Sequence, residues 1–166
     1  MRAGIALGAN LGDRVASLTN ARTRIFALPG VSAPLLSSAL YETEPVECEP
    51  GAERFLNAVV EIGYAGRSQQ LLEELKKIEA ALGRPSERAR NHSRTIDLDL
   101  LYHGARLLDD PQLQLPHPRM HLRGFVIHPL AEIRPNLVLP GQTRTVGELG
   151  EELTHGPSVV RSPRQW

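Results

Sequence analysis

The sequence predicts an α+β sandwich with a mostly antiparallel sheet. Short apolar runs that alternate with a period of two predict strands, longer runs with helical spacing predict helices, and both tight loops and helices connect the strands. Hydrophobic residues make up 41% of the chain and charged residues 23%, which is typical of a folded globular protein. A length of 166 residues is typical of one core, so we expect a single domain over residues 1–166.

Each predicted helix has an apolar stripe or recognisable end signals. Asp13 is a suitable N-cap for the first helix, and Pro29 with Gly30 ends its pattern. Ser68 is the expected cap of the second helix, and Gly83 its stop. The helices predicted in this way cover residues 14–28, 69–82, 124–132 and 146–153. The segment 105–124, rich in proline, is expected to be loop with a short helix.

The predicted strands cover residues 3–7, 35–41, 55–62 and 95–102. Gly8, Asn10 and Gly12 are expected to close the first strand with a turn. In the third strand, alternation assigns one face to the core, with Leu56, Ala58, Val60 and Ile62. The opposite face carries Phe55, Asn57, Val59 and Glu61. An amide beside an aromatic ring makes this second face a candidate ligand surface.

Asp97 and Asp99 share one face of the last predicted strand, while Ile96, Leu98, Leu100 and Tyr102 take the other. Carboxylates two residues apart on a strand repel by about 2–3 kcal/mol at an effective dielectric of 20. A hard cation such as Mg²⁺ would remove this repulsion, since it is held by one or two carboxylates plus substrate phosphates. The alternative is a solvated outer face of an edge strand.

An arginine-rich loop, residues 83–94, directly precedes this strand. Its four arginines, against the single acid Glu87, give it a net charge of +3. Guanidinium groups there could bind phosphate through paired hydrogen bonds, or could form internal salt bridges with the carboxylates. The loop contains no aromatic platform of the kind that single-stranded nucleic acid requires.

The composition excludes several other classes. With 19 basic and 19 acidic residues the net charge is zero, which argues against a nucleic-acid or polybasic membrane partner. No phosphate-binding glycine loop of the P-loop or dinucleotide type occurs, and the six histidines lack zinc-site spacing. His117, between two prolines, could serve a turn or a ligand. The lone Cys48 and the absence of a signal-like leader predict a cytoplasmic protein.

Several short motifs, in order along the chain, resemble those of the 6-hydroxymethyl-7,8-dihydropterin pyrophosphokinase (HPPK) family. They are ALGANLGD at 6–13, Tyr41-Glu42-Thr43, Phe55-Leu56-Asn57-Ala58, RTIDLD at 94–99, Pro116-His117 and Arg123-Gly124-Phe125. The resemblance covers essentially the whole chain. It implies a ferredoxin-like αβα sandwich with flexible catalytic loops that close on substrate, and transfer of pyrophosphate from ATP to a pterin alcohol with release of AMP.

The resemblance also implies roles for individual residues. Asp97 and Asp99 would hold two Mg²⁺ ions, with Arg84 and Arg94 as the phosphate-binding catalytic arginines. ATP, the co-substrate, would further contact Lys76, Glu79, Leu100, His117 and Arg123. The pterin ring would stack between Phe55 and Phe125, near Asn57, Thr43, Glu44 and Val46. The partners expected are therefore small molecules, bound by a monomer.

The chain departs from the family pattern at several positions: Lys76, Ser86, Asn91, Gln112, Gln114 and Glu44. None lies at the carboxylate pair or at Arg84 and Arg94, so we expect activity to persist with altered nucleotide affinity or loop closure. Two other hypotheses remain open at this point. One is a ferredoxin-like small-molecule binding module without catalysis, in which the acidic pair is solvated. The other is a nucleotidyl transferase, which would release pyrophosphate instead of AMP. Independently of both, Phe55 and Phe125 could be ordinary core aromatics.

Overall fold

A computed structural model describes residues 1–45, 51, 53–83, 94–153 and 158–166. Its main sheet contains β1 (Arg2–Ala9), β2 (Val31–Ser37), β3 (Tyr41–Thr43), β4 (Phe55–Tyr64), β5 (Asp97–His103) and β8 (Val159–Arg161). The strand order is β5-β1-β4-β3-β8, and every pair is antiparallel. β2 pairs with the second half of β4, beside β3. A separate hairpin joins β6 (Leu108–Asp110) to β7 (Leu113–Leu115).

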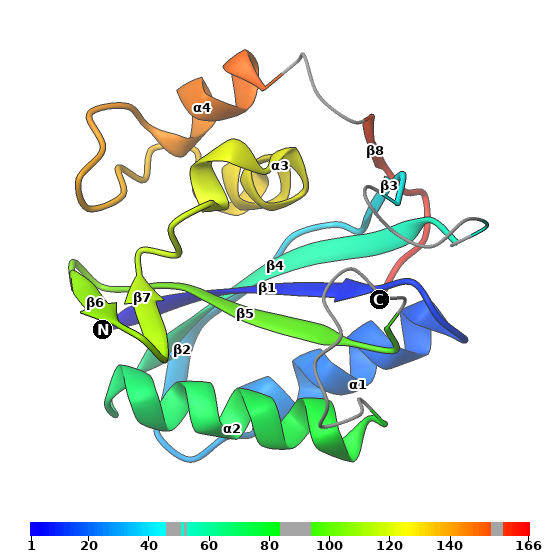
Figure 1. Cartoon of the computed structure of the whole chain (residues 1–166), viewed down its shortest axis with the longest axis horizontal. Helices are drawn as coiled ribbons and strands as arrows, with labels where there is room; N and C mark the ends of the chain where they lie inside the picture. The colour runs from blue at the N-terminus through cyan, green and yellow to red at the C-terminus, as the bar shows by residue number, and fades with distance from the viewer. Residues whose placement is uncertain (46–50, 52, 84–93, 154–157) are drawn as a thin grey trace.

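The helices cover both faces of this sheet (Figure 1). α1 (Arg14–Phe26) and α2 (Ser68–Ala81) lie on one face. α3 (Gly124–Ile133) packs on the other face, with α4 (Val146–Glu152) against it and the short 3-10 helix η1 (Met120–Leu122) before it. Strands β5-β1-β4-β2, with helices after β1 and β4, form the ferredoxin-like βαββαβ arrangement. The predicted α+β class is therefore confirmed. Within the described ranges no helix is long and apolar enough to cross a membrane.

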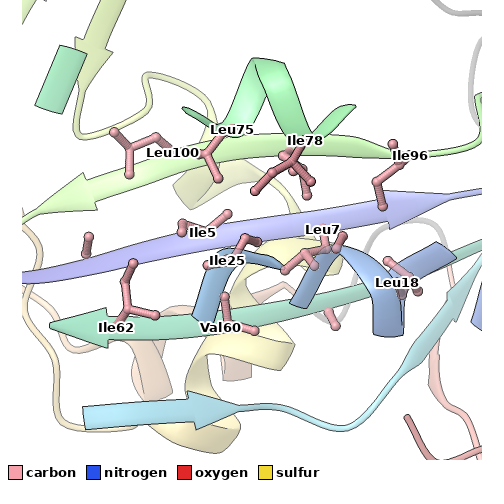
Figure 2. Packing of buried hydrophobic residues seen from close by; sticks show 14 of the residues in the cluster. Ile5, Leu7, Leu18, Ile25, Val60, Ile62, Leu75, Ile78, Ile96 and Leu100 are labelled. Carbon is pink, nitrogen blue, oxygen red and sulfur yellow. The ribbon is translucent and has the colours of Figure 1, made fainter. Parts of the chain in front are cut away.

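Strand β1 lies between two hydrophobic cores, because successive side chains of a strand point to opposite faces of the sheet. Ile5 and Leu7 point toward α1 and α2, where they pack near Leu18, Ile25 and Leu75 (Figure 2). The opposite face of β1 carries Arg2 at its start, followed by Gly4, Ala6 and Gly8. This face lies under α3, where a second core forms around Val59, Val126, Ile127 and Leu130. β4 is consequently buried on both of its faces.

Several predicted boundaries were wrong. β1 runs to Ala9, so Gly8 lies inside the strand and pairs with both neighbours. The predicted strand 35–41 is divided between β2 and β3, and β5 begins at Asp97 instead of residue 95. Ser68 is the first residue of α2 rather than its cap, which is Arg67. The Ser68 hydroxyl instead lies 2.9 Å from Nδ1 of the buried His103.

The predicted face of Tyr102 was also wrong. The register between β1 and β5 changes between Gly4 and Ile5, which leaves Leu101 as an extra residue. Tyr102 therefore turns to the α3 side, and its hydroxyl donates to Glu61 Oε2 at 2.5 Å. A Cβ built on Gly4 would lie only 2.3 Å from the Tyr102 ring, so the ring occupies the space that this glycine leaves.

Candidate active site

The candidate site lies where β1 ends and β4 and β5 begin. Gly8 of β1 is directly opposite Asn57 of β4 on one side and Asp97 of β5 on the other. Ala6, one step further in, is opposite Asp99. Directly opposed residues of an antiparallel sheet point to the same face. Asn57, Asp97 and Asp99 therefore share the face that α3 covers, as the alternation predicts.

Two arginines from outside the sheet pair with the two carboxylates. Arg94 Nη1 donates to Asp97 Oδ2 at 2.6 Å, and Arg123 Nη1 lies 3.6 Å from Asp99 Oδ2. Asp97 keeps 24% of its side chain exposed, and Asp99 keeps 40%. The arginines thus offset the mutual repulsion of the carboxylates, while both aspartate side chains stay partly exposed.

The donor set at this point fits a hard cation that is also bound by a ligand. Among the described residues, no group of three or more His, Cys, Asp and Glu side chains is placed to hold a metal ion. A carboxylate pair, however, is what Mg²⁺ uses when substrate phosphates complete its coordination. The residues present therefore fit a metal–phosphate complex better than a closed metal site built from protein ligands.

His117 and Arg123 complete the polar side of the site. Burial lowers the pKa of His117, although Asp99 opposes this shift. The His117 imidazole is therefore neutral at pH 7, and its backbone N–H donates to Leu101 O at 2.7 Å. Burial likewise lowers the pKa of the Arg123 guanidinium, and Asp99 again opposes the shift. The positive charge at this edge thus comes from arginine and not from histidine.

An aromatic and amide surface adjoins the carboxylates. Asn57 Nδ2 donates to the Thr43 hydroxyl at 2.9 Å, and both residues are buried. Phe55, opposite Thr43 in the register, begins β4 on the same face and is partly buried. Phe125, near the start of α3, is also partly buried, and Arg123 Cζ lies 5.5 Å from its ring centre. Glu44 forms an exposed ion pair with Arg54.

The predicted nucleotide contacts on α2 and β5 lie on the other side of the sheet. Leu100 is buried in the core between the sheet, α1 and α2. Glu79 is 6% exposed, and its Oε1 accepts from Leu98 N at 2.8 Å. Lys76 is exposed on α2. The structure therefore brings Arg94, Asp97, Asp99, His117 and Arg123 together, whereas Lys76, Glu79 and Leu100 lie on the α2 side of the sheet. Arg84 and Val46 lie outside the described residues, as do Ser86 and Asn91.

Asn10, which the sequence pattern predicts only as part of a turn, also holds the backbone at Arg94. Asn10 is fully buried, and its Oδ1 accepts from Arg94 N at 2.7 Å. Its own backbone N–H donates to Arg94 O at 3.0 Å, and its Nδ2 donates to Glu53 O at 3.4 Å. Asn10 thus links the end of β1 to the segments that carry Arg94 and Phe55. The sequence feature that could have indicated this role is a side-chain amide that lies between Gly8 and Gly12, directly after a buried strand.

The fold and the site together define a class: a ferredoxin-like α+β protein with a carboxylate–arginine site suited to a phosphate ligand and its metal. The chain belongs to the 7,8-dihydro-6-hydroxymethylpterin-pyrophosphokinase (HPPK) family, whose model matches residues 4–135.

Named relatives agree with this assignment. The chain is 44% identical over 143 residues to the 2-amino-4-hydroxy-6-hydroxymethyldihydropteridine pyrophosphokinase of Methylorubrum extorquens, covering 86% of this chain and 88% of that protein. It is 44% identical over 129 residues to the protein of the same name from Bacillus subtilis, covering 78% and 75%.

A solved structure of wild-type Plasmodium falciparum HPPK-DHPS shares the fold, with a TM-score of 0.69 at 16% identity. The match covers 91% of this chain but 42% of that one, so the chain spans about two fifths of the solved protein. At this identity the likeness concerns the fold alone.

Proposed function

We propose that the residues gathered at Asp97 and Asp99 carry out the reaction of the HPPK family in this chain. The chain is a pyrophosphokinase of folate biosynthesis, which transfers pyrophosphate from ATP to 6-hydroxymethyl-7,8-dihydropterin. The hydroxymethyl oxygen attacks the β-phosphorus, the bond from that phosphorus to the oxygen bridging it to the α-phosphate breaks, and AMP leaves. The hydroxyl proton passes to solvent water. The observation that carries the residue assignment is the contact of two carboxylates with two arginines on one sheet face.

Asp97 and Asp99 are the proposed Mg²⁺ ligands, with two ions shared between these carboxylates and the ATP phosphates. The partial exposure of both side chains supports this assignment. Bound Mg²⁺ would neutralise phosphate charge and align the attacking and leaving oxygens. The protein contributes alignment of two substrates and forms no covalent intermediate.

The arginines are the proposed phosphate ligands. Arg94 and Arg123 would exchange their carboxylate contacts for paired hydrogen bonds to phosphate oxygens. Arg84 is the third proposed phosphate ligand. Asn10 supports this role for Arg94, because it accepts from the backbone N–H of Arg94 and donates to the backbone carbonyl of Arg94. His117, neutral at pH 7, would hydrogen-bond the nucleotide without adding charge. Lys76, Glu79 and Leu100 would contact ATP from the α2 side, so the nucleotide would have to pass around the edge of β5.

The pterin would lie on the aromatic and amide surface. Its ring would stack between Phe55 and Phe125, whose aromatic faces favour offset stacking on a flat bicyclic ring. The Thr43 hydroxyl holds Asn57 Nδ2, which leaves Asn57 Oδ1 to accept from an N–H on the pterin edge. The backbone near Thr43, Glu44 and Val46 would complete this edge.

The remaining assignments concern the whole chain. We assign residues 1–166 to one pyrophosphokinase domain that acts as a cytoplasmic monomer on small molecules. Zero net charge supports the absence of nucleic-acid and membrane partners.

Product analysis tests the proposed function. The purified chain is incubated with ATP, the pterin alcohol and MgCl₂, and nucleotides are separated by chromatography. We expect AMP in a one-to-one ratio with pyrophosphorylated pterin, and no AMP when chelator replaces Mg²⁺. Release of pyrophosphate would indicate a nucleotidyl transferase instead. No AMP with any divalent ion would indicate a binding module without catalysis.

A further inference from the structure

We propose that Gly8 is a specificity-determining residue. Because it has no side chain, the pterin can lie over its α-carbon and extend from Asn57 to Asp97. This inference rests on the proposed function, which puts the pterin edge at Asn57 and the hydroxymethyl group near the carboxylates. It adds a residue of β1 to a site otherwise assigned to β4, β5, α3 and loops.

The sheet register places Gly8 between the two ends of the substrate. Gly8 is directly opposite both Asn57 and Asp97, so the three residues form one row across three strands on the α3 face. Neighbouring strands lie about 4.8 Å apart, so the backbones at Asn57 and Asp97 are about 10 Å from each other. Gly8 contributes no side chain to this interval. A flat molecule can therefore contact both polar side chains only if the residue between them has no side chain that rises above the sheet.

Backbone conformation does not account for the glycine. The residues with positive φ include Gly12 and Gly30 but not Gly8, which is ordinary paired strand. Glycine in a strand interior loses conformational entropy on folding and gives no packing in return. An alanine at this position would suit the backbone better. The space above the α-carbon is therefore what the glycine provides.

A comparison within β1 shows that this space faces the site. Gly4 points to the same face, but there the Tyr102 ring occupies the position of a Cβ, at 2.3 Å. At Gly8 the only neighbouring atom within 4 Å of a built Cβ, among the described residues, is Asn57 Oδ1, at 3.2 Å. That amide is held by Thr43 at 2.9 Å, so it cannot easily move aside. A methyl group would therefore crowd the atom proposed to accept from the pterin.

Gly8→Ala tests this role. We expect the KM for the pterin alcohol to rise about tenfold to a hundredfold, the range that one extra methyl group or a small misplacement produces. The Kd for the ATP–magnesium complex should stay within about twofold. The urea midpoint should stay close to that of the unmodified chain, since the entropy that alanine removes from the unfolded chain offsets the crowding at Asn57. The matched control is Gly150→Ala in α4, where a Cβ makes only ordinary contacts at 3.7 Å or more.

A measurement on the unmodified chain covers the case in which Gly8→Ala does not fold. With bound pterin, nuclear Overhauser effects should connect the Gly8 α-protons to the protons of the pterin's hydroxymethyl group or ring. Their absence at saturating pterin would overturn the proposal, as would an unchanged pterin KM in a folded, AMP-forming Gly8→Ala variant. Failure of the unmodified chain to form AMP would instead refute the proposed function.

Discussion

Removal of the Glu61 carboxylate should destabilise the fold strongly and leave the chemistry intact. Glu61 lies on β4 with its side chain fully buried. Its Oε1 accepts from Arg2 Nη1 at 2.9 Å and from Arg134 Nη1 at 2.7 Å. Its Oε2 accepts from the Tyr102 hydroxyl at 2.5 Å. This one carboxylate therefore joins β1, β5 and the end of α3 to β4.

The expected loss in free energy of unfolding depends on the three groups that Glu61→Ala leaves without their acceptor. Removing one partner of a buried ion pair typically costs about 3–5 kcal/mol. Arg2 and Arg134 keep 51% and 25% of their side chains exposed, so both can regain water. We therefore expect a loss at the lower end of this range, about 3 kcal/mol. This value includes the cost of leaving the Tyr102 hydroxyl without its acceptor. Glu61→Gln should lose about half as much, since its amide oxygen can still accept.

Urea unfolding followed by circular dichroism measures this loss. Glu74→Ala is the matched control: Glu74 pairs with Lys77 on the exposed side of α2, and we expect no measurable change. Glu61 is four residues along β4 from Asn57, a separation of about 13 Å, so AMP formation at 25 °C should stay near the unmodified rate. A loss below about 1 kcal/mol for Glu61→Ala would refute the argument from buried charge.

Three further predictions concern single residues. Phe125→Ala should weaken pterin binding more than ATP binding in calorimetric titrations, and equal effects would contradict the stacking assignment. Burial lowers the pKa of His103, so the unfolded chain gains a proton below about pH 6.5 that the folded chain does not, and stability should fall as pH falls. His103→Gln should flatten that part of the urea-midpoint profile, and an unchanged slope would contradict the assignment. Asp13 accepts from Ala16 N at 3.0 Å as the cap of α1, so Asp13→Ala should cost about 1 kcal/mol in urea unfolding, and no loss would contradict the cap.

The parts of the fold that sequence could predict are those set by local periodicity. Helices α1 and α2 follow from apolar stripes, and the Asp13 cap from side-chain chemistry. The short strands β3, β6, β7 and β8 have three residues each, too few for a period to be visible. The reversed face of Tyr102 depends on one extra residue in β5, and that is decided by pairing with β1, not by β5 alone.

In the candidate site, too, local patterns predict some features, while others depend on contacts between distant segments. Alternation alone predicts that Asp97 and Asp99 share a face, and the structure confirms it. Which arginine meets which carboxylate depends on packing between distant segments, as does the contact between Asn10 and Arg94. The position of Gly8 between Asn57 and Asp97 needs the register of three strands, which no local pattern contains.

The rate of AMP formation by Asp97→Ala and Asp99→Ala tests the central claim most directly. Each variant is compared with Glu151→Gln, a change on the exposed side of α4, at saturating ATP, pterin and MgCl₂. We expect both aspartate variants to lose rate by orders of magnitude while their circular dichroism and urea midpoints stay close to those of the unmodified chain. Near-normal turnover in either folded variant would contradict the assignment of the carboxylate pair as the metal site of the reaction.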